Sequence, residues 1–236
     1  MHTLILLAAG SGSRMQGCVA DKILAPLHGR PVFAHSLSEF IESGVVGKIV
    51  IVYRDEAQRT ALQESVADVD TSDLPVLWVQ GGAERQDSVL HALEAAAPSE
   101  YVYIHDGARP LITVSALSAI RDAVQRDGAA VLAHPIVDTV KRIPNPNNLT
   151  LIELEDLDRR RLWGMETPQA FRYATILESY RHVKATGLSI TDDTAAAGTL
   201  GYRSTIVPNA HPNPKITTSA DMAYIEWLLQ NEAATS

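Results

Sequence analysis

The chain has 236 residues, 46% of them hydrophobic, and a formal net charge of −8. This length and hydrophobic content suffice for a domain with a substantial core, and the acidic balance argues against a general nucleic-acid-binding surface, which needs clustered Lys and Arg. The single cysteine, Cys18, excludes an internal disulfide and a multi-cysteine zinc site and fits a reducing cytosol.

The first apolar run, residues 3–8 (TLILLA), is typical of a strand that is buried on both faces. The run is too short to span a bilayer, and no basic segment precedes it. We therefore expect a cytoplasmic protein with neither a signal peptide nor a membrane anchor.

Apolar runs and amphipathic segments then alternate along the first half of the chain. Further strands are expected at 48–53, 75–80, 101–106 and 129–136. The spacing of apolar residues predicts helices at 32–43, 56–67, 85–96 and 114–126. Because right-handed crossovers between parallel strands place helices on both faces of a sheet, we expect a doubly wound, mostly parallel, Rossmann-like α/β fold.

The pattern changes after Val137. Two β-prone pieces at 138–143 and 149–154 are joined by PNPNN, whose prolines and asparagines favour a turn. We interpret residues 138–160 as a protruding β-hairpin arm. Since an isolated hairpin of this length is hard to stabilise, we expect it to pack against a second subunit in a homodimer.

The remaining elements complete one domain spanning residues 1–236. They are helices at 173–185, 192–200 and 218–230 and a strand at 202–208. The stretch 167–171 (TPQAF) could be merely a turn that enters the next helix, and alone it decides nothing. The sequence contains no internal repeat, low-complexity tract or evident linker.

A glycine-rich loop, AAGSGSRM at 8–15, follows the first strand, where open α/β sheets bind ligands. The dinucleotide fingerprint would need glycine in place of Met15, and a P-loop would need Gly-Lys in place of the Gly-Cys pair at 17–18. Both of these motifs are therefore absent.

The loop instead offers backbone N–H groups to an anion, with Arg14 and Lys22 as nearby cations. These features would suit a triphosphate, but a glycine turn with exposed basic residues fits the spacing equally well. The loop residues proposed to contact the ligand are Ala8, Ala9, Gly10, Ser11 and Gly12.

Two more segments leave predicted strands. In QGGAERQDSV, 80–89, a helix begins near Glu84, and its N-terminus attracts phosphate or base edges. In IHDGARP, 104–110, Asp106 stands at a strand end. It could cap the next helix or, beside anion-binding loops, bind Mg²⁺, which uses one or two carboxylates plus phosphate oxygens.

The second half supplies cations and hydroxyls to an otherwise acidic chain. Thr139, Thr167 and Thr191 carry hydroxyls that could fix a small phosphorylated substrate. The basic residues that stand out in this half are Lys141, Arg142, Arg159, Arg160, Arg161 and Lys215. Some of these six are ordinary surface charges. The histidines show no metal-ligand spacing.

Together with the glycine loop, the motifs GGAERQDSV, HDGARP, DTVKR, LWGMETPQAF, TDD and NPKITTSAD occur in this order. The chain thereby resembles the 2-C-methyl-D-erythritol 4-phosphate cytidylyltransferase family from residue 3 to about 229. The glycine loop alone marks only the wider nucleotidyltransferase group. The resemblance implies transfer of CMP from CTP to methylerythritol phosphate, with release of pyrophosphate and no enzyme nucleophile.

The resemblance also implies roles for individual residues. Those that stabilise the transition state or orient the attacking phosphate are Arg14, Lys22, Arg159 and Lys215. Those beside CTP are Gly82, Arg85, Ser88, Asp106 and Gly107. Asp106 would also bind Mg²⁺. Those that hold the methylerythritol phosphate are Arg109, Thr139, Thr167 and Thr191. The arm of one subunit would contribute to its neighbour's site.

The chain departs from the family pattern at three places, of which one, Gly107 where alanine is usual, should be harmless. The family usually has Pro-Lys-Gln around the catalytic lysine, whereas this chain has ADKIL around Lys22. Glu166 stands where relatives often have an uncharged residue, which puts a negative charge close to a phosphate site.

Three other functions fit part of the pattern. A ribitol 5-phosphate cytidylyltransferase would share the loop and several motifs. A nucleotide-binding regulatory module without catalysis is opposed by the presence of both Arg14 and Lys22. An NAD-linked dehydrogenase fits least well because of Met15.

Overall fold

The computed structural model describes residues 1–10, 21–67, 69–71 and 74–232. Its centre is a seven-stranded sheet in the order β11-β7-β10-β6-β1-β4-β5. The strands are β1 (His2–Leu7), β4 (Lys48–Tyr53), β5 (Val76–Gln80), β6 (Tyr101–Asp106), β7 (Ala129–Pro135), β10 (Trp163–Arg172) and β11 (Thr205–Pro208). All neighbours pair in parallel except β10, which is antiparallel to β6 and β7. The expected mostly parallel sheet is confirmed.

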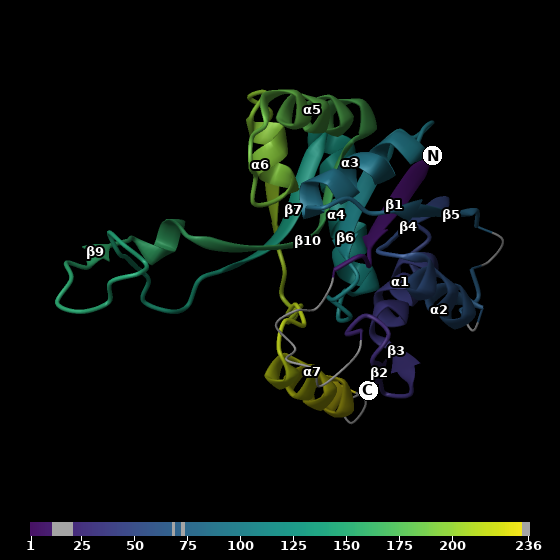
Figure 1. Cartoon of the computed structure of the whole chain (residues 1–236), viewed down its shortest axis with the longest axis horizontal. Helices are drawn as coiled ribbons and strands as arrows, with labels where there is room; N and C mark the ends of the chain where they lie inside the picture. Colours follow the sequence, from purple (N-terminus) through teal and green to yellow (C-terminus); the bar gives the residue numbers. More distant parts are fainter. Residues whose placement is uncertain (11–20, 68, 72–73, 233–236) are drawn as a thin grey trace.

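Helices cover both faces of this sheet. The apolar cluster on one face contains residues of α1 (Val32–Glu42), α2 (Glu56–Val66), α4 (Val114–Asp127) and α7 (Ser219–Glu232). The cluster on the other face contains residues of α3 (Arg85–Ala95), α5 (Tyr173–Thr186) and α6 (Asp193–Gly198). Figure 1 shows these helices around the strands. None of the helices in the described part of the chain has the length and apolar character to cross a membrane.

Local sequence explains where several of these helices begin and end. The Asp55 carboxylate accepts a hydrogen bond from Gln58 N and caps α2. The Thr113 hydroxyl does the same for α4 by accepting from Ala116 N. Helix α4 ends at Gly128, whose φ of 85° is strained for other residues.

Strand β10 was not expected from the sequence, and interpreting 167–171 as a turn was wrong. Pro168 lacks an N–H and argues against a strand, but it lies where the register between β10 and β7 shifts, between Met165 and Gln169. Such irregularities tolerate proline. The strand also buries polar side chains, including Glu166 and Gln169, so it lacks the apolar pattern of its neighbours.

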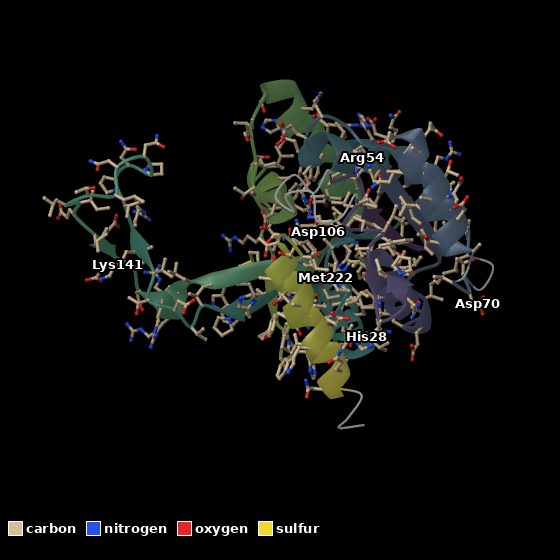
Figure 2. All side chains as sticks on the ribbon, turned by 60° about the horizontal axis from the view of Figure 1, so that its bottom comes forward. His28, Arg54, Asp70, Asp106, Lys141 and Met222 are labelled. Atoms are coloured by element: carbon tan, nitrogen blue, oxygen red, sulfur yellow. The ribbon has the colours of Figure 1, made fainter. Side chains whose placement is uncertain are left out.

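The arm is an antiparallel pair that stands apart from the body of the molecule (Figure 1). Its strands are β8 (Lys141–Arg142) and β9 (Glu155–Asp156), so the second one lies just beyond the piece expected at 149–154. Figure 2 shows Lys141 on the arm, far from Arg54 and Asp106 in the body. A short 3-10 helix, η2 (Arg159–Arg161), then leads back to β10.

A further hairpin was also missed. Strands β2 (Pro26–Leu27) and β3 (Arg30–Pro31) pair around His28 and Gly29, both of which have positive φ. A two-residue turn with positive φ suits the twist of a hairpin. The remaining helices and β11 match the expected segments closely, although β11 begins at Thr205 rather than at 202.

The inserted strand β10 should be essential to the core. Phe171 has no exposed surface and packs with the helices of the α3, α5 and α6 face. We expect Phe171→Ala to lower the free energy of unfolding by about 3–5 kcal/mol, because it leaves a cavity. Urea denaturation followed by circular dichroism measures this loss. Tyr224→Ala, on an exposed face of α7, should lose less than about 1 kcal/mol; equal losses in both variants would contradict the placement of β10.

Candidate active site

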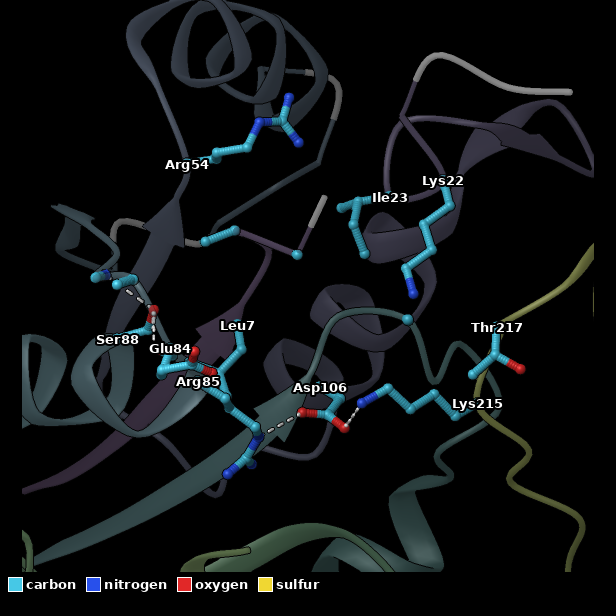
Figure 3. A pocket seen from close by; sticks show the side chains of 15 residues that line it. Leu7, Lys22, Ile23, Arg54, Glu84, Arg85, Ser88, Asp106, Lys215 and Thr217 are labelled. Carbon is cyan, nitrogen blue, oxygen red and sulfur yellow. Dashed lines mark hydrogen bonds and ion pairs between the residues drawn. The ribbon is translucent and has the colours of Figure 1, made fainter. Parts of the chain in front are cut away.

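A pocket of about 560 Å³ opens where four neighbouring parallel strands end (Figure 3). Its lining includes Leu7 at the end of β1, Arg54 just after β4, Gly82 after β5 and Asp106 at the end of β6. The carboxyl edge of a parallel sheet is where such folds bind ligands. The other lining residues are Ala9, Gly10, Lys22, Ile23, Ala83, Glu84, Arg85, Ser88, Ala108, Lys215 and Thr217.

The turn between β5 and α3 is folded too tightly for larger residues. A Cβ on Gly82 would lie 2.3 Å from the Asp87 Cβ, so only glycine fits there without a shift. Gly82 N donates to the Ser88 Oγ at 3.0 Å, and that hydroxyl donates to Glu84 O at 3.1 Å. The Ser88 hydroxyl therefore holds the backbone of this turn in place at the edge of the pocket.

Asp106 is a buried carboxylate between two cations. Lys215 Nζ lies 2.6 Å from its Oδ2, and Arg85 Nε lies 3.4 Å from its Oδ1. Burial alone would raise the pKa of Asp106, but Arg85 and Lys215 outweigh burial and hold this pKa far below its ordinary value. The side chain is therefore an anion throughout the physiological range.

Arg85 is itself held by Asp193, a fully buried residue of α6. The two terminal nitrogens of Arg85 each lie 2.9 Å from a different carboxylate oxygen of Asp193. Tyr180 OH donates to the same carboxylate. Burial opposes the charged form, but Asp193 and Asp106 raise the pKa of Arg85 above its ordinary value. Neither Asp193 nor Tyr180 was predicted as a site residue, although Asp193 belongs to the quoted TDD motif.

Below Asp106 lies a layer of fixed hydrogen bonds. Asp106 N donates to Thr167 Oγ1 at 3.1 Å. The backbone oxygen of Arg109 can only accept, so His105 Nε2, 3.0 Å away, carries the proton of the neutral ring. His105 Nδ1 then accepts from the Thr167 hydroxyl at 3.1 Å. Thr167 thus supports the backbone of Asp106 from outside the pocket lining.

Arg109, which the sequence predicts to bind substrate, does not line the pocket. Its NH1 donates to Asn213 O at 2.6 Å, and burial lowers the pKa of its guanidinium. Its Nε is a buried nitrogen that lacks a hydrogen-bond partner among the described residues.

Lys22 reaches the pocket from the other end of the chain and points toward the Asp106–Lys215 pair in Figure 3. Its Nζ donates to Ile216 O at 3.0 Å. This contact holds the Lys22 side chain against the residue that follows Lys215, so one short segment of backbone carries Lys215 and binds Lys22.

Asp21 fixes the backbone around Lys22, where the family pattern has proline. Its Oδ1 accepts from Ile23 N at 3.0 Å. Its Oδ2 accepts from Gln58 Nε2 at 2.7 Å and from Arg54 NH1 at 3.1 Å. Sequence reasoning missed these partners because they lie more than thirty residues away.

Several expected site residues lie elsewhere. Thr139 and Arg159 are exposed at the base of the arm, where Arg159 NH1 donates to Val137 O at 2.8 Å. Thr191 is exposed and does not line the pocket. Ala8 and Gly107 are buried beside it and donate backbone hydrogen bonds to Val52 O and Leu7 O. Ser11, Gly12 and Arg14 lie outside the described residues.

The described residues contain no group of three or more His, Cys, Asp or Glu side chains able to hold a metal ion. A cation at Asp106 would therefore need most of its ligands from a bound anion. Mg²⁺ bound to phosphates is commonly coordinated in this way.

Comparison with known proteins identifies relatives along nearly the whole chain. Residues 2–231 match the family model for 2-C-methyl-D-erythritol 4-phosphate cytidylyltransferase. A curated protein of that name from Shouchella clausii is 37% identical, with 97% of this chain and 96% of the relative covered. One from Bacillus anthracis is 34% identical, with 97% and 98% covered.

Solved structures agree with this match. The 4-diphosphocytidyl-2C-methyl-D-erythritol synthase of Anaerococcus prevotii superposes with a TM-score of 0.82 at 25% identity, covering 98% of both chains. The 2-C-methyl-D-erythritol 4-phosphate cytidylyltransferase of Thermus thermophilus gives 0.75 at 26% identity, covering 96% of this chain and 98% of the relative.

The buried His105 should make stability depend on pH in a defined window. Burial lowers the pKa of His105 from 6.5 to about 4. Between these values the unfolded chain binds a proton that the folded chain excludes, so stability falls as the pH falls. We expect His105→Gln to reduce the slope of the free energy of unfolding against pH by up to about 1.4 kcal/mol per pH unit.

Urea denaturation at several pH values from 4.5 to 7 would measure both slopes. His2 and His35, whose pKa values are also lowered by burial, contribute equally in both proteins and cancel in the difference. Asp106 contributes mainly below its ordinary pKa of 3.8, outside this window. Identical slopes in the two proteins would show that His105 is not kept neutral by the fold.

Proposed function

The chain belongs to the 2-C-methyl-D-erythritol 4-phosphate cytidylyltransferase family, and from that premise we propose how its pocket carries out the reaction. The enzyme transfers CMP from CTP to 2-C-methyl-D-erythritol 4-phosphate and releases pyrophosphate, a step of isoprenoid precursor synthesis. The observation that carries this function is the match over nearly the full chain, combined with a pocket lined by cations at the strand ends. The comparisons do not favour the alternative ribitol 5-phosphate substrate.

CTP would occupy the pocket with its phosphates toward Lys22. A volume of about 560 Å³ is in the range that holds a small-molecule ligand. The backbone of the Gly82–Ser88 turn and of Ala9 and Gly10 would accommodate the base and sugar. Ser11, Gly12 and Arg14 would complete the loop around the triphosphate, as the family resemblance implies.

The chemistry is a direct displacement. An oxygen of the methylerythritol phosphate forms a bond to the α-phosphorus of CTP, and the bond from that phosphorus to the bridging oxygen of the β-phosphate breaks. Pyrophosphate leaves with the electron pair. Because both reactants are anions, the protein must position them and balance the charge that develops. We assign this work to Lys22 and Lys215, with Arg14 and Arg159 as further cations.

Asp106 fits a magnesium site of the one-carboxylate type. Its carboxylate is ionised and lies in the pocket, and triphosphate oxygens would supply the other ligands. Mg²⁺ bound there would neutralise phosphate charge. Lys215, now paired with Asp106, would then be free to contact the substrate phosphate.

We propose a homodimer in which the arm of one subunit reaches the other subunit's pocket. Within one subunit, Thr139 and Arg159 stand on the arm, away from the pocket lining. The arm also exposes apolar side chains that a second subunit would cover. They are Val137, Leu149, Leu151 and Leu154. This arrangement would bring Arg159 to a phosphate that its own subunit does not bind.

We further propose that residues 1–236 form one domain and that the enzyme works in the cytoplasm. A single continuous sheet supports the first point. The lone cysteine of the sequence supports the second.

Removal of either lysine should impair turnover. We expect Lys22→Ala and Lys215→Ala each to lower kcat by about 10²–10³, because each removes a preorganised charge from the transition state. Pyrophosphate release with saturating CTP and methylerythritol phosphate measures the effect. Arg126→Ala, which removes an exposed cation paired with Asp127 on α4, is the matched control and should retain wild-type turnover.

Near-normal turnover in either lysine variant would remove that residue from the catalytic machinery. The same assay with ribitol 5-phosphate tests the substrate class. Faster turnover of ribitol 5-phosphate by the wild-type enzyme would overturn the proposed acceptor.

Mixing two inactive variants tests the shared site. Arg159→Ala disables the arm and Lys22→Ala disables the pocket. If the arm of one subunit serves the other's pocket, random exchange gives heterodimers with one intact site, so about a quarter of all sites recover activity. Activity after joint refolding is compared with that of each variant refolded alone. A mixture as inactive as its components would mean that both residues act within one subunit.

A further inference from the structure

Glu166 is a buried carboxylate of β10 that lies outside the pocket lining. Only 3% of it is exposed, and all its hydrogen bonds are internal. Its Oε1 lies 2.7 Å from His134 Nδ1, which must be the donor because a carboxylate only accepts. Its Oε2 accepts from Asn209 Nδ2 at 2.9 Å and from Asn213 Nδ2 at 3.1 Å. The Glu166 carboxylate, whose charge we expected near a phosphate site, is therefore already hydrogen-bonded within the fold.

The two asparagines bound by Glu166 delimit the segment 209–213, which follows β11 and belongs to no helix or strand. Asn209 N donates to Ala133 O at 2.9 Å, and Asn213 Nδ2 also donates to Thr167 O at 3.0 Å. A segment without regular structure depends on such bonds for its position. Glu166 thus ties this segment to β10 at both of its ends.

The next residues of the chain hold the cations of the site. Asn213 O accepts from Arg109 NH1, Lys215 pairs with Asp106, and Ile216 O accepts from Lys22 Nζ. Ile216 N donates to Ala108 O at 2.9 Å. A shift of 209–216 would therefore move the contacts of three cations at once.

We propose that Glu166 is a positioning residue for CMP transfer, which fixes the segment 209–216 so that Lys22 and Lys215 face the reacting phosphates. This inference rests on the proposed function of the pocket. Hydrogen bonds to an ionised acceptor are about twice as strong as neutral ones, so Glu166 secures both asparagines more firmly than an uncharged residue would. Because Glu166 does not line the pocket, its effect on the reaction passes through the segment.

Two substitutions separate the effect of the Glu166 hydrogen bonds from the effect of its charge. In Glu166→Gln the amide oxygen can still accept from both asparagines, and the amide N–H can donate to the other tautomer of His134. In Glu166→Ala all three bonds are lost. We expect Glu166→Ala to lower kcat by about tenfold to a hundredfold through misplaced cations, and Glu166→Gln by less than about threefold. The KM for CTP should change little in either variant.

A second measurement does not depend on activity. Hydrogen exchange of the backbone amides in 209–216 should be faster in Glu166→Ala than in the wild type, while the amides of β1 and β4 remain unchanged. Glu178→Ala is the matched control, because Glu178 accepts a hydrogen bond from Tyr202 on the surface of α5. It should alter neither kcat nor exchange in 209–216.

The outcomes distinguish this inference from the proposed function. If wild-type protein fails to turn over CTP and methylerythritol phosphate, the proposed function is wrong, whatever the exchange shows. If the wild type is active and Glu166→Ala folds with unchanged kcat and unchanged exchange, Glu166 does not position the site. Should Glu166→Ala not fold, Asn209→Ala removes one of the three bonds and should lower kcat by about threefold to tenfold; an unchanged kcat there would also overturn the inference.

Discussion

The site depends on one buried carboxylate, Asp106, at the end of a central strand. A carboxylate taken out of water must be paired, because an isolated buried charge is very costly. Its partners come from distant parts of the chain: Arg85 is 21 residues away and Lys215 is 109 residues away. The need to neutralise Asp106 therefore brings the β5–α3 turn and the segment before α7 to the same edge of the sheet.

The two cations beside Asp106 are not equivalent. Arg85 is fixed by paired hydrogen bonds to the fully buried Asp193 and by a longer contact to Asp106. Lys215 makes a single short contact with Asp106. A phosphate can compete for an ammonium held by one carboxylate far more easily than for a guanidinium held by two. Arg85 is thus better suited to supporting Asp106 than to contacting the base. Lys215 is suited to exchanging its contact with Asp106 for one with a phosphate.

The parallel part of the fold was predictable because it follows local rules. Apolar runs such as 48–53 and 101–106 are buried along their whole length, and the intervening helices show regular periodicity. Strand β10 lacked these signals, since it contains Pro168 and buries polar residues whose partners lie far away in sequence. The ion pairs Arg85–Asp193 and Arg54–Asp21 also produce no pattern in the local sequence, because their partners lie far apart in the chain. Motifs located Asp106, Lys22 and Lys215, and also Arg85 and Thr167, which hold Asp106, but not Asp21 or Asp193.

The lysines that face the pocket come from opposite ends of the chain, yet they share one support. Lys22 donates to the backbone oxygen of Ile216, the residue next to Lys215. The position of one ammonium is therefore coupled to the backbone that carries the other. That backbone has no regular structure, so its position depends on two backbone bonds, from Asn209 N and Ile216 N, and on the side-chain bonds of Glu166 and Asn213. In a reaction between two anions, where correct placement of charge is most of the catalysis, residues one layer behind the pocket matter because they set where the cations stand.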